Sequence, residues 1–162
     1  MPRWLLRDGQ VVADDWRNLS DAEIDDSSAL ILSVDQWLSD RDRWIRRGGR
    51  LGVILAPAHN VELLVPDLAR LDLVGAEFPN PSEGRGYTQG RLLRERWKFA
   101  GELRAAGAIR RDQLFFLARC GFNSFELPES ELAGASSALS TFSAAYQPSN
   151  DAGLSVELRR RF

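Results

Sequence analysis

The sequence predicts a single α/β domain whose βα units build a mainly parallel sheet that resembles part of a β/α barrel. The first observation is the run Leu-Gly-Val-Ile-Leu at 51–55, which is apolar throughout, as strands inside parallel sheets usually are. The second is spacing, because expected strands start near residues 51, 73, 102 and 124, about 22 to 29 residues apart, the length of a βα unit. The third is length, because 162 residues hold about five such units and a closed eight-fold barrel needs more.

The N-terminal part is expected to form a β-hairpin. Residues 3–6 and 10–13 lean towards apolar side chains, and the Asp8-Gly9 pair between them favours a tight turn. The acidic stretch 18–28 that follows is expected to be a loop or a short helical turn.

A buried strand and a helix are expected next. Residues 29–32 are apolar and predict the strand. Trp37 and Trp44 recur at helical spacing with other apolar residues, which predicts a helix over 34–47, and the glycine pair at 48–49 would end it.

Beyond the strand at 51–55, helical patterns alternate with strands. The expected elements are a helical turn at 61–71 limited by Pro66, strands at 73–78, 101–105 and 124–127, and helices at 87–98, 110–119 and 129–146. One domain therefore covers 1–146. Residues 147–162 carry Pro148, Gly153 and three terminal arginines, and they are expected to form a flexible tail.

Composition and charge exclude several classes of function. A net charge of −2 argues against non-specific binding to nucleic acid. No window approaches 18 uninterrupted apolar residues and no signal-peptide pattern opens the chain, so we expect a cytoplasmic protein without a membrane span. Cys120 and His59 are each the only residue of their kind, which excludes an intramolecular disulfide, a cysteine-held iron–sulfur cluster and a conventional zinc site. The residues identify no cofactor and no metal.

The turn Gly84-Arg85-Gly86 is the first candidate ligand site. It lies between an expected strand and the next helix, where backbone N–H groups and the Arg85 guanidinium could hold a small oxyanion, with Tyr87 directly after the turn. With Gly90 the letters approach a dinucleotide fingerprint, but that fingerprint should leave its strand immediately and this one does not. A purely structural loop is the alternative.

Three charged residues form a second candidate. Alternation along the strands places Glu77, Arg104 and Glu126 on one face of the sheet, near the carboxyl ends of three strands that are expected to be neighbours. Two carboxylates beside an arginine could bind a polar ligand. They could equally be a buried structural charge cluster, because buried charges need partners.

Two further junctions carry polar residues. Asp112 and Gln113 open the helix at 110–119 and could point towards a ligand, although Asp112 also suits the positive end of a helix. His59 lies just past the strand at 51–55, where a site residue can lie, but a single loop histidine is a weak signal.

The stretch from about 76 to 127 resembles a family of uncharacterised bacterial proteins commonly labelled as an oxidoreductase of sulfite reduction and encoded near sulfite reductase. The matching pieces are Gly-Arg-Gly-Tyr at 84–87, Leu93-Arg94, Gly-Glu-Leu-Arg-Ala at 101–105, Asp112-Gln113 and Arg-Cys-Gly-Phe at 119–122. Together these pieces span about a third of the chain. The chain departs from the family pattern at Glu83, where the family usually has Asp, and at Ala108, where an Asp often follows the glycine.

The resemblance implies an accessory protein of assimilatory sulfite reduction. In this interpretation Arg85, Arg104 and the turn amides receive an oxyanion, such as sulfite or a phosphorylated ligand, while Glu77 and Asp112 position it or move protons. Two alternatives stay open: a non-catalytic partner that docks to sulfite reductase or another sulfate-assimilation enzyme, and an oxidoreductase with an unidentified cofactor. A homodimer is compatible with each of them.

Overall fold

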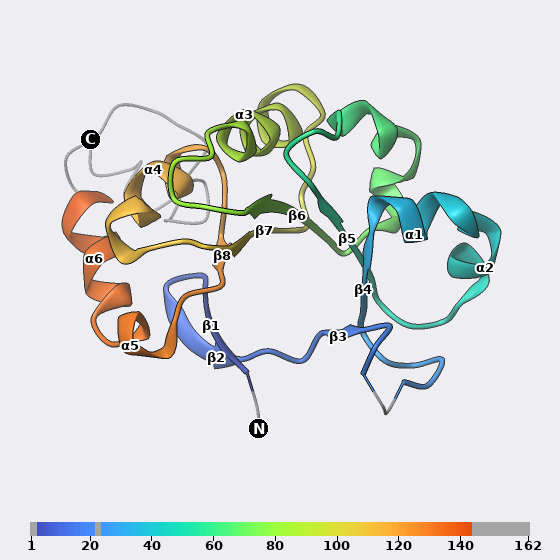
Figure 1. The fold of residues 1–162 in the computed structure, drawn as a ribbon, viewed down its shortest axis with the longest axis horizontal. Helices are drawn as coiled ribbons and strands as arrows, with labels where there is room; N and C mark the ends of the chain where they lie inside the picture. Colours follow the sequence, from blue (N-terminus) through green and yellow to red (C-terminus); the bar gives the residue numbers. More distant parts are fainter. Residues whose placement is uncertain (1–2, 22–23, 144–162) are drawn as a thin grey trace.

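The computed structural model describes residues 3–21 and 24–143, in which eight strands form one mixed sheet (Figure 1). The strand order is β2-β1-β8-β7-β6-β5-β4-β3. Strands β3 to β8 run parallel to one another, and β1 lies antiparallel to both β2 and β8. The strands are β1 (Trp4–Arg7), β2 (Gln10–Ala13), β3 (Arg17–Asn18), β4 (Leu30–Ser33), β5 (Leu51–Leu55), β6 (Leu73–Phe78), β7 (Glu102–Gly107) and β8 (Ser124–Phe125). The predicted α/β half-barrel with an N-terminal hairpin is confirmed.

The helices lie along the outer, convex side of the curved sheet (Figure 1). They are α1 (Val34–Ser39), α2 (Arg41–Arg46), α3 (Arg85–Arg91), α4 (Leu114–Arg119), α5 (Glu129–Leu132) and α6 (Ala135–Ser143), with 3-10 turns η1 (Val61–Leu63), η2 (Val65–Arg70) and η4 (Arg111–Gln113). The π-helical turn η3 (Leu92–Arg96) continues α3. The main core fills the space between these helices and the convex face, where every second strand residue is apolar and buried.

The concave face of the sheet carries the residues of opposite parity. Ile31, Ile54 and Leu73 pack there with Trp16 in a second, smaller apolar cluster. Glycine at position 75 makes this packing possible, because a Cβ there would collide with the side chain of Ile54. A small residue on β6 therefore makes room for a large one on β5, as alternating small and large residues do inside small β-barrels.

The two edges of the sheet are joined by a very short link. β2 and β3 are the outermost strands, yet only residues 14–16 separate them in the chain. Four Cα–Cα steps span about 15 Å at most, so the sheet must curl until its edges approach each other. The link places Asp14 and Trp16 against the concave face, where both side chains are buried.

The structure corrects the first predicted helix and reveals a strand that was not predicted. The helix expected over 34–47 is two helices, α1 and α2, because Asp40 adopts an extended φ of −148° that interrupts the turn. Both predicted tryptophans, Trp37 and Trp44, are nevertheless buried. At the start of the stretch 18–28, which was expected to be a loop, the unpredicted strand β3 (Arg17–Asn18) pairs with β4 through only two residues.

The C-terminal helix also differs from the prediction. It is broken into α5 and α6, and Gly134 between them has a φ of +77°, a conformation that favours glycine. The last residues of the helix expected over 129–146 and the tail expected over 147–162 lie outside the described residues.

Candidate functional site

The Gly84-Arg85-Gly86 turn begins helix α3 after strand β6. Gly84 is the residue before the first helical turn, with a φ of −100°. Gly86 lies against the aromatic ring of Phe78, and a Cβ at this position would approach Cε1 to 2.8 Å and Cζ still more closely. Since real Cβ atoms do not come so close, Gly86 is required for packing of the helix on the sheet.

The side chains around this turn are held by one another. Arg85 is 67% exposed, and its Nε lies 3.7 Å from Glu83. The Nε2 of Gln113 donates to the hydroxyl of Tyr87 at 3.1 Å and to the carbonyl of Pro81 at 3.2 Å. Burial raises the pKa of Tyr87, so this hydroxyl stays protonated at neutral pH. Tyr87 and Gln113 therefore lie together and fasten the loop after β6 to η4, while Arg85 faces solvent.

Arg104 lies in the middle of the concave face and is fully buried. Its guanidinium donates to both carboxylate oxygens of Asp14 at 3.2 Å and to Glu102 at 2.8 Å. Glu126 approaches its Nη1 to 3.6 Å. Burial lowers the pKa of Arg104, but the neighbouring carboxylates outweigh burial and raise it. The arrangement stabilises a permanent cation, and its hydrogen-bonding groups already have protein partners.

The ion pairs continue from Arg104 along the concave face. Arg7 on β1 lies 3.4 Å from Glu102 and 3.4 Å from Asp15, and Arg50 is also paired with Asp15. Burial raises the pKa of Glu102, but the nearby arginines and hydrogen bonds more than offset it, so the pKa is lowered. This network links the N-terminal hairpin, residues 14–16 and the parallel strands, and it satisfies charges that would otherwise be costly to bury.

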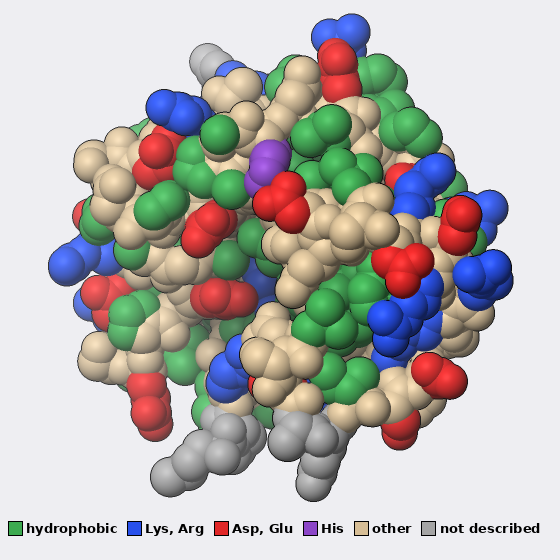
Figure 2. Space-filling model, turned by 45° about the vertical axis from the view of Figure 1, so that its right-hand side comes forward, with side chains coloured by type: hydrophobic (Ala, Val, Ile, Leu, Met, Phe, Trp, Pro, Cys, Tyr) green, Lys and Arg blue, Asp and Glu red, His purple; other side chains and the backbone are tan. Residues whose placement is uncertain are grey.

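Glu77 belongs to a different part of the concave face. It pairs in register with Ala106, one level beyond Arg104 towards the carboxyl ends of the strands, and its side chain is exposed. It lines a hollow of about 430 Å³, which we call the mouth hollow, at the carboxyl ends of β4, β5 and β6. The lining residues are Asn18, Leu19, Ser20, Ile31, Leu32, Ser33, Asp35, Gln36, Ile54, Ala56, His59 and Glu77. Figure 2 shows the histidine, in purple, beside acidic side chains at this hollowed face.

The imidazole of His59 is fixed at the rim of the mouth hollow. Its Nδ1 accepts a hydrogen bond from the backbone N–H of Ala56 at 3.0 Å. The buried Gln89 on α3 donates through Nε2 to the carbonyls of Ala56 and His59, both at 2.9 Å. Because Nδ1 accepts, a neutral His59 carries its proton on Nε2, which leaves that nitrogen as a donor. A helix thus positions the loop that presents the histidine.

The charges of the mouth hollow decide which ligands it can take. The lining residues include two carboxylates, Asp35 and Glu77, and no lysine or arginine. Ser33 and Gln36 at the rim bond to each other in the cap that starts α1. The hollow therefore favours polar groups that donate hydrogen bonds or carry positive charge.

The residues predicted from the sequence fall into four groups. Tyr87 and Gln113 bond to each other, and Arg104 and Glu126 lie together in the ion network. Glu77 is separate from both groups, and it shares the mouth hollow with His59. Gly84 and Arg85 at the start of α3 and Asp112 in η4 are exposed to solvent. The lining residues Asn18 and Asp35 were not predicted, because neither stands in a recognisable motif.

Neither a metal-binding cluster nor a membrane-spanning helix occurs among the residues that the structure describes. Within residues 3–21 and 24–143, no group of three or more His, Cys, Asp or Glu side chains is placed to hold a metal ion. Among the helices that the structure describes, none has the length and apolar character to cross a membrane.

The chain also matches the sequence model of a protein family. A sequence model of a family described as a bacterial protein of unknown function (DUF934) matches residues 52–156. The matched segment starts within β5 and contains the loop of His59, the turn at Gly84 and the strand of Arg104. No curated protein matches the chain.

Proposed function

We propose that this chain, which belongs to the DUF934 family of bacterial proteins of unknown function, binds a small polar ligand in the mouth hollow and serves as an accessory protein of assimilatory sulfite reduction. The observation that supports ligand binding is the place of the hollow, at the carboxyl ends of β4, β5 and β6. Parallel sheets and β/α barrels bind their ligands at this end, because loops of several strands meet there. The context of sulfite reduction comes from the resemblance of residues 76–127 to proteins labelled in that way.

Two side chains carry the binding role in this proposal. The Nε2 of His59 donates to the ligand, and the carboxylate of Glu77 accepts from it or offsets a positive charge. Gln89 keeps the histidine loop in place without contacting the ligand. A role in positioning the loop explains why the amide of the buried Gln89 donates to the carbonyls of both Ala56 and His59.

An oxyanion is the ligand that the resemblance implies. Of the two arginines predicted to receive it, Arg104 is buried among carboxylates, whereas Arg85 is two-thirds exposed. We therefore assign sulfite to Arg85 and the adjoining turn. The mouth hollow is assigned to a different ligand, one that carries hydrogen-bond donor groups.

Thermal unfolding in the presence of small molecules tests the proposal. The panel contains sulfite, sulfate, phosphate, nucleotides, small polyols and small amines, each from 0.1 to 10 mM. A ligand that binds only the folded protein adds about 1.4 kcal/mol at ten times its Kd, which raises Tm by about 3 to 6 °C. The variants Glu77→Gln and His59→Asn should abolish a shift that arises in the hollow, and Asn retains an oxygen to accept the Ala56 N–H. Arg85→Ala should abolish only a shift caused by an anion.

Asp42→Asn on α2 is the matched control, because it removes an exposed carboxylate from a helix that contributes no residue to the lining of the hollow, and it should leave every shift unchanged. A panel without any shift would refute ligand binding. If the protein then co-purified with sulfite reductase, the non-catalytic docking alternative would be the better proposal.

A further inference from the structure

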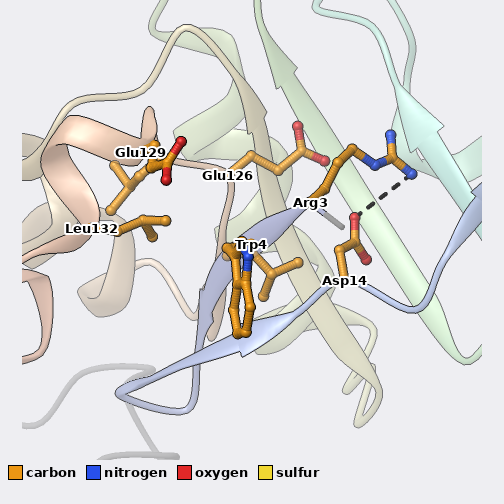
Figure 3. Close-up of a pocket in the computed structure, with 8 residues that line it drawn as sticks. Arg3, Trp4, Asp14, Glu126, Glu129 and Leu132 are labelled. Atoms are coloured by element: carbon orange, nitrogen blue, oxygen red, sulfur yellow. Dashed lines mark ion pairs between the residues drawn. The ribbon is translucent and has the colours of Figure 1, made fainter. Parts of the chain in front are cut away.

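A second pocket, which we call the Trp4 pocket, opens where the start of β1 meets the chain after β8 (Figure 3). Its volume is about 300 Å³, and it is lined by Arg3, Trp4, Leu5, Asp14, Glu126, Leu127, Glu129 and Leu132. None of these residues lines the mouth hollow. The Trp4 pocket is therefore a separate site.

The walls of the Trp4 pocket combine apolar and acidic side chains. Trp4, Leu5, Leu127 and Leu132 supply the apolar surface, and Figure 3 shows Glu126 and Glu129 above the indole of Trp4 on different elements. Trp4 is 49% exposed. An aromatic face with nearby carboxylates is the arrangement that attracts an organic cation, because the ring and the carboxylates both favour positive charge.

Arg3, the only cationic residue among those that line the Trp4 pocket, already has protein partners. Arg3 donates from Nη2 to the carbonyl of Trp16 at 2.8 Å and lies 3.9 Å from Asp14, so it turns away from Glu129 (Figure 3). Glu126 is 3.6 Å from Arg104 but keeps 42% of its side chain exposed, and Glu129 is exposed. Three carboxylates and one arginine line the pocket, and the buried Arg104 behind Asp14 and Glu126 offsets a second charge, which leaves one negative charge in excess.

We propose that the Trp4 pocket binds an ammonium or guanidinium group carried on a short apolar stem. The charged group lies between Glu126 and Glu129 and over the face of Trp4, and the stem packs on Leu127 and Leu132. Such a group occurs in small amines and in the arginine and lysine side chains of proteins. The binding is independent of the ligand in the mouth hollow.

Heteronuclear NMR of the indole N–H groups tests this proposal. The Trp4 signal is assigned by its loss in Trp4→Phe, and the protein is titrated with N-acetyl-arginine amide, N-acetyl-lysine amide and neutral N-acetyl-citrulline amide up to 20 mM. We expect the Trp4 signal to move with the two cations and not with citrulline, which has nearly the shape of arginine without its charge. An unmoved Trp4 signal, or an equal response to citrulline, would overturn the proposal.

Variants locate the binding and separate it from the mouth hollow. Glu129→Gln removes an exposed carboxylate on α5 with little risk to the fold, and it should weaken binding of the arginine derivative at least fivefold. Trp4→Leu should weaken it by a similar factor, with circular dichroism to confirm folding. Glu77→Gln should leave it unchanged, so failure here and failure of the mouth hollow are distinguishable. Unchanged affinity in Glu129→Gln and Trp4→Leu would place the cation elsewhere and refute the proposal.

The source of the cation follows from two further ligands. Agmatine represents a free amine, and the capped peptide Gly-Arg-Gly represents an exposed arginine of a partner protein. Tighter binding of agmatine would support a small-molecule ligand, and tighter binding of the peptide would support a basic segment of a partner.

Discussion

Gly86 lies directly against the ring of Phe78, and this contact explains the glycine of a turn whose sequence suggested an anion site. Gly90, one helical turn later, has the same relationship with Phe122, whose Cζ would be 2.6 Å from a Cβ at that position. The rings of Phe78 and Phe122 themselves meet edge to face at 6.0 Å. The glycine spacing that approaches a dinucleotide fingerprint is therefore a surface on which two aromatic rings pack.

The Gly86 contact predicts a loss of stability on substitution. Gly86→Ala should lower the free energy of unfolding by about 1 to 3 kcal/mol, because the added methyl group overlaps a buried ring. Urea unfolding followed by circular dichroism measures this change. Gly84→Ala is the control, since Gly84 has open space around its Cα and a negative φ, and it should be neutral or slightly stabilising. Equal effects of the two substitutions would contradict the packing role.

The buried pair of Glu102 and Arg104 predicts a dependence of stability on pH. The folded protein holds the pKa of Glu102 below its usual 4.5, so the unfolded chain takes up the proton first as pH falls. The stabilisation is therefore complete above about pH 4.5 and is lost as pH falls through the lower, folded-state pKa. Glu102→Gln should cost about 2 to 3 kcal/mol at pH 7, and this difference from the native protein should shrink towards pH 3.

Chemical unfolding at a series of pH values measures that difference. Because Asp15 also has a lowered pKa, both proteins lose stability in acid, and only the gap between them reports on Glu102. A gap that stays constant from pH 7 to pH 3 would show that the charge of Glu102 contributes nothing to the fold.

The hydrogen bonds of Arg94 predict that even a conservative substitution at this position lowers the stability of the fold strongly. Its guanidinium donates to the carbonyls of Gly121 at 2.9 Å, Phe99 at 2.7 Å and Gly101 at 2.9 Å, and to the side chain of Asn123 at 3.2 Å. A lysine keeps the charge but cannot reach these acceptors together, so Arg94→Lys should cost about 2 to 4 kcal/mol. Arg96→Lys, on the exposed side of the same turn, should change stability by less than about 0.5 kcal/mol. Similar Tm values for the two variants would rule out this role.

The burial of Cys120 predicts that its thiol reacts slowly with labelling reagents. The residue is 5% exposed, and burial raises the pKa of its thiol despite the nearby Arg91. Little thiolate exists at pH 8, and reagents reach it poorly, so labelling with a disulfide reagent should be at least about tenfold slower in the folded protein than in urea. Rapid labelling of the folded protein would indicate that this helix end opens readily.

Much of the fold could be predicted because its strands carry local signals. The apolar run of β5 and the spacing of β6, β7 and β8 follow from residues that must be buried, and structure and prediction agree there. The strand β3 has no such signal, since it consists only of the polar residues Arg17 and Asn18. Its position is set by the buried Trp16 beside it, which is a tertiary effect.

The candidate site was harder to predict, because its residues come from positions that are far apart in the sequence. Alternation along parallel strands predicts that Arg104 and Glu126 share one face of the sheet, and in the structure their side chains lie 3.6 Å apart. Asp14 contacts Arg104 across 90 positions of sequence, and Gln89 holds the His59 loop across 30. No pattern within a single element encodes contacts of this range.

The short link at residues 14–16 has a consequence for how the chain reaches its native state. Asp14 completes the surroundings of Arg104, and Asp8 bonds to Asn123 across 115 positions, although both aspartates precede the segment matched by the family. Ordering contacts between such remote positions costs loop entropy before any burial compensates for it, so closure of the half-barrel belongs late in the folding reaction. A fragment that starts at Gly52 would keep Glu102 and Glu126 beside Arg104 but would lose Asp14 and the strands β1 to β4. We expect such a fragment to be degraded by proteases rather than to persist as a folded unit.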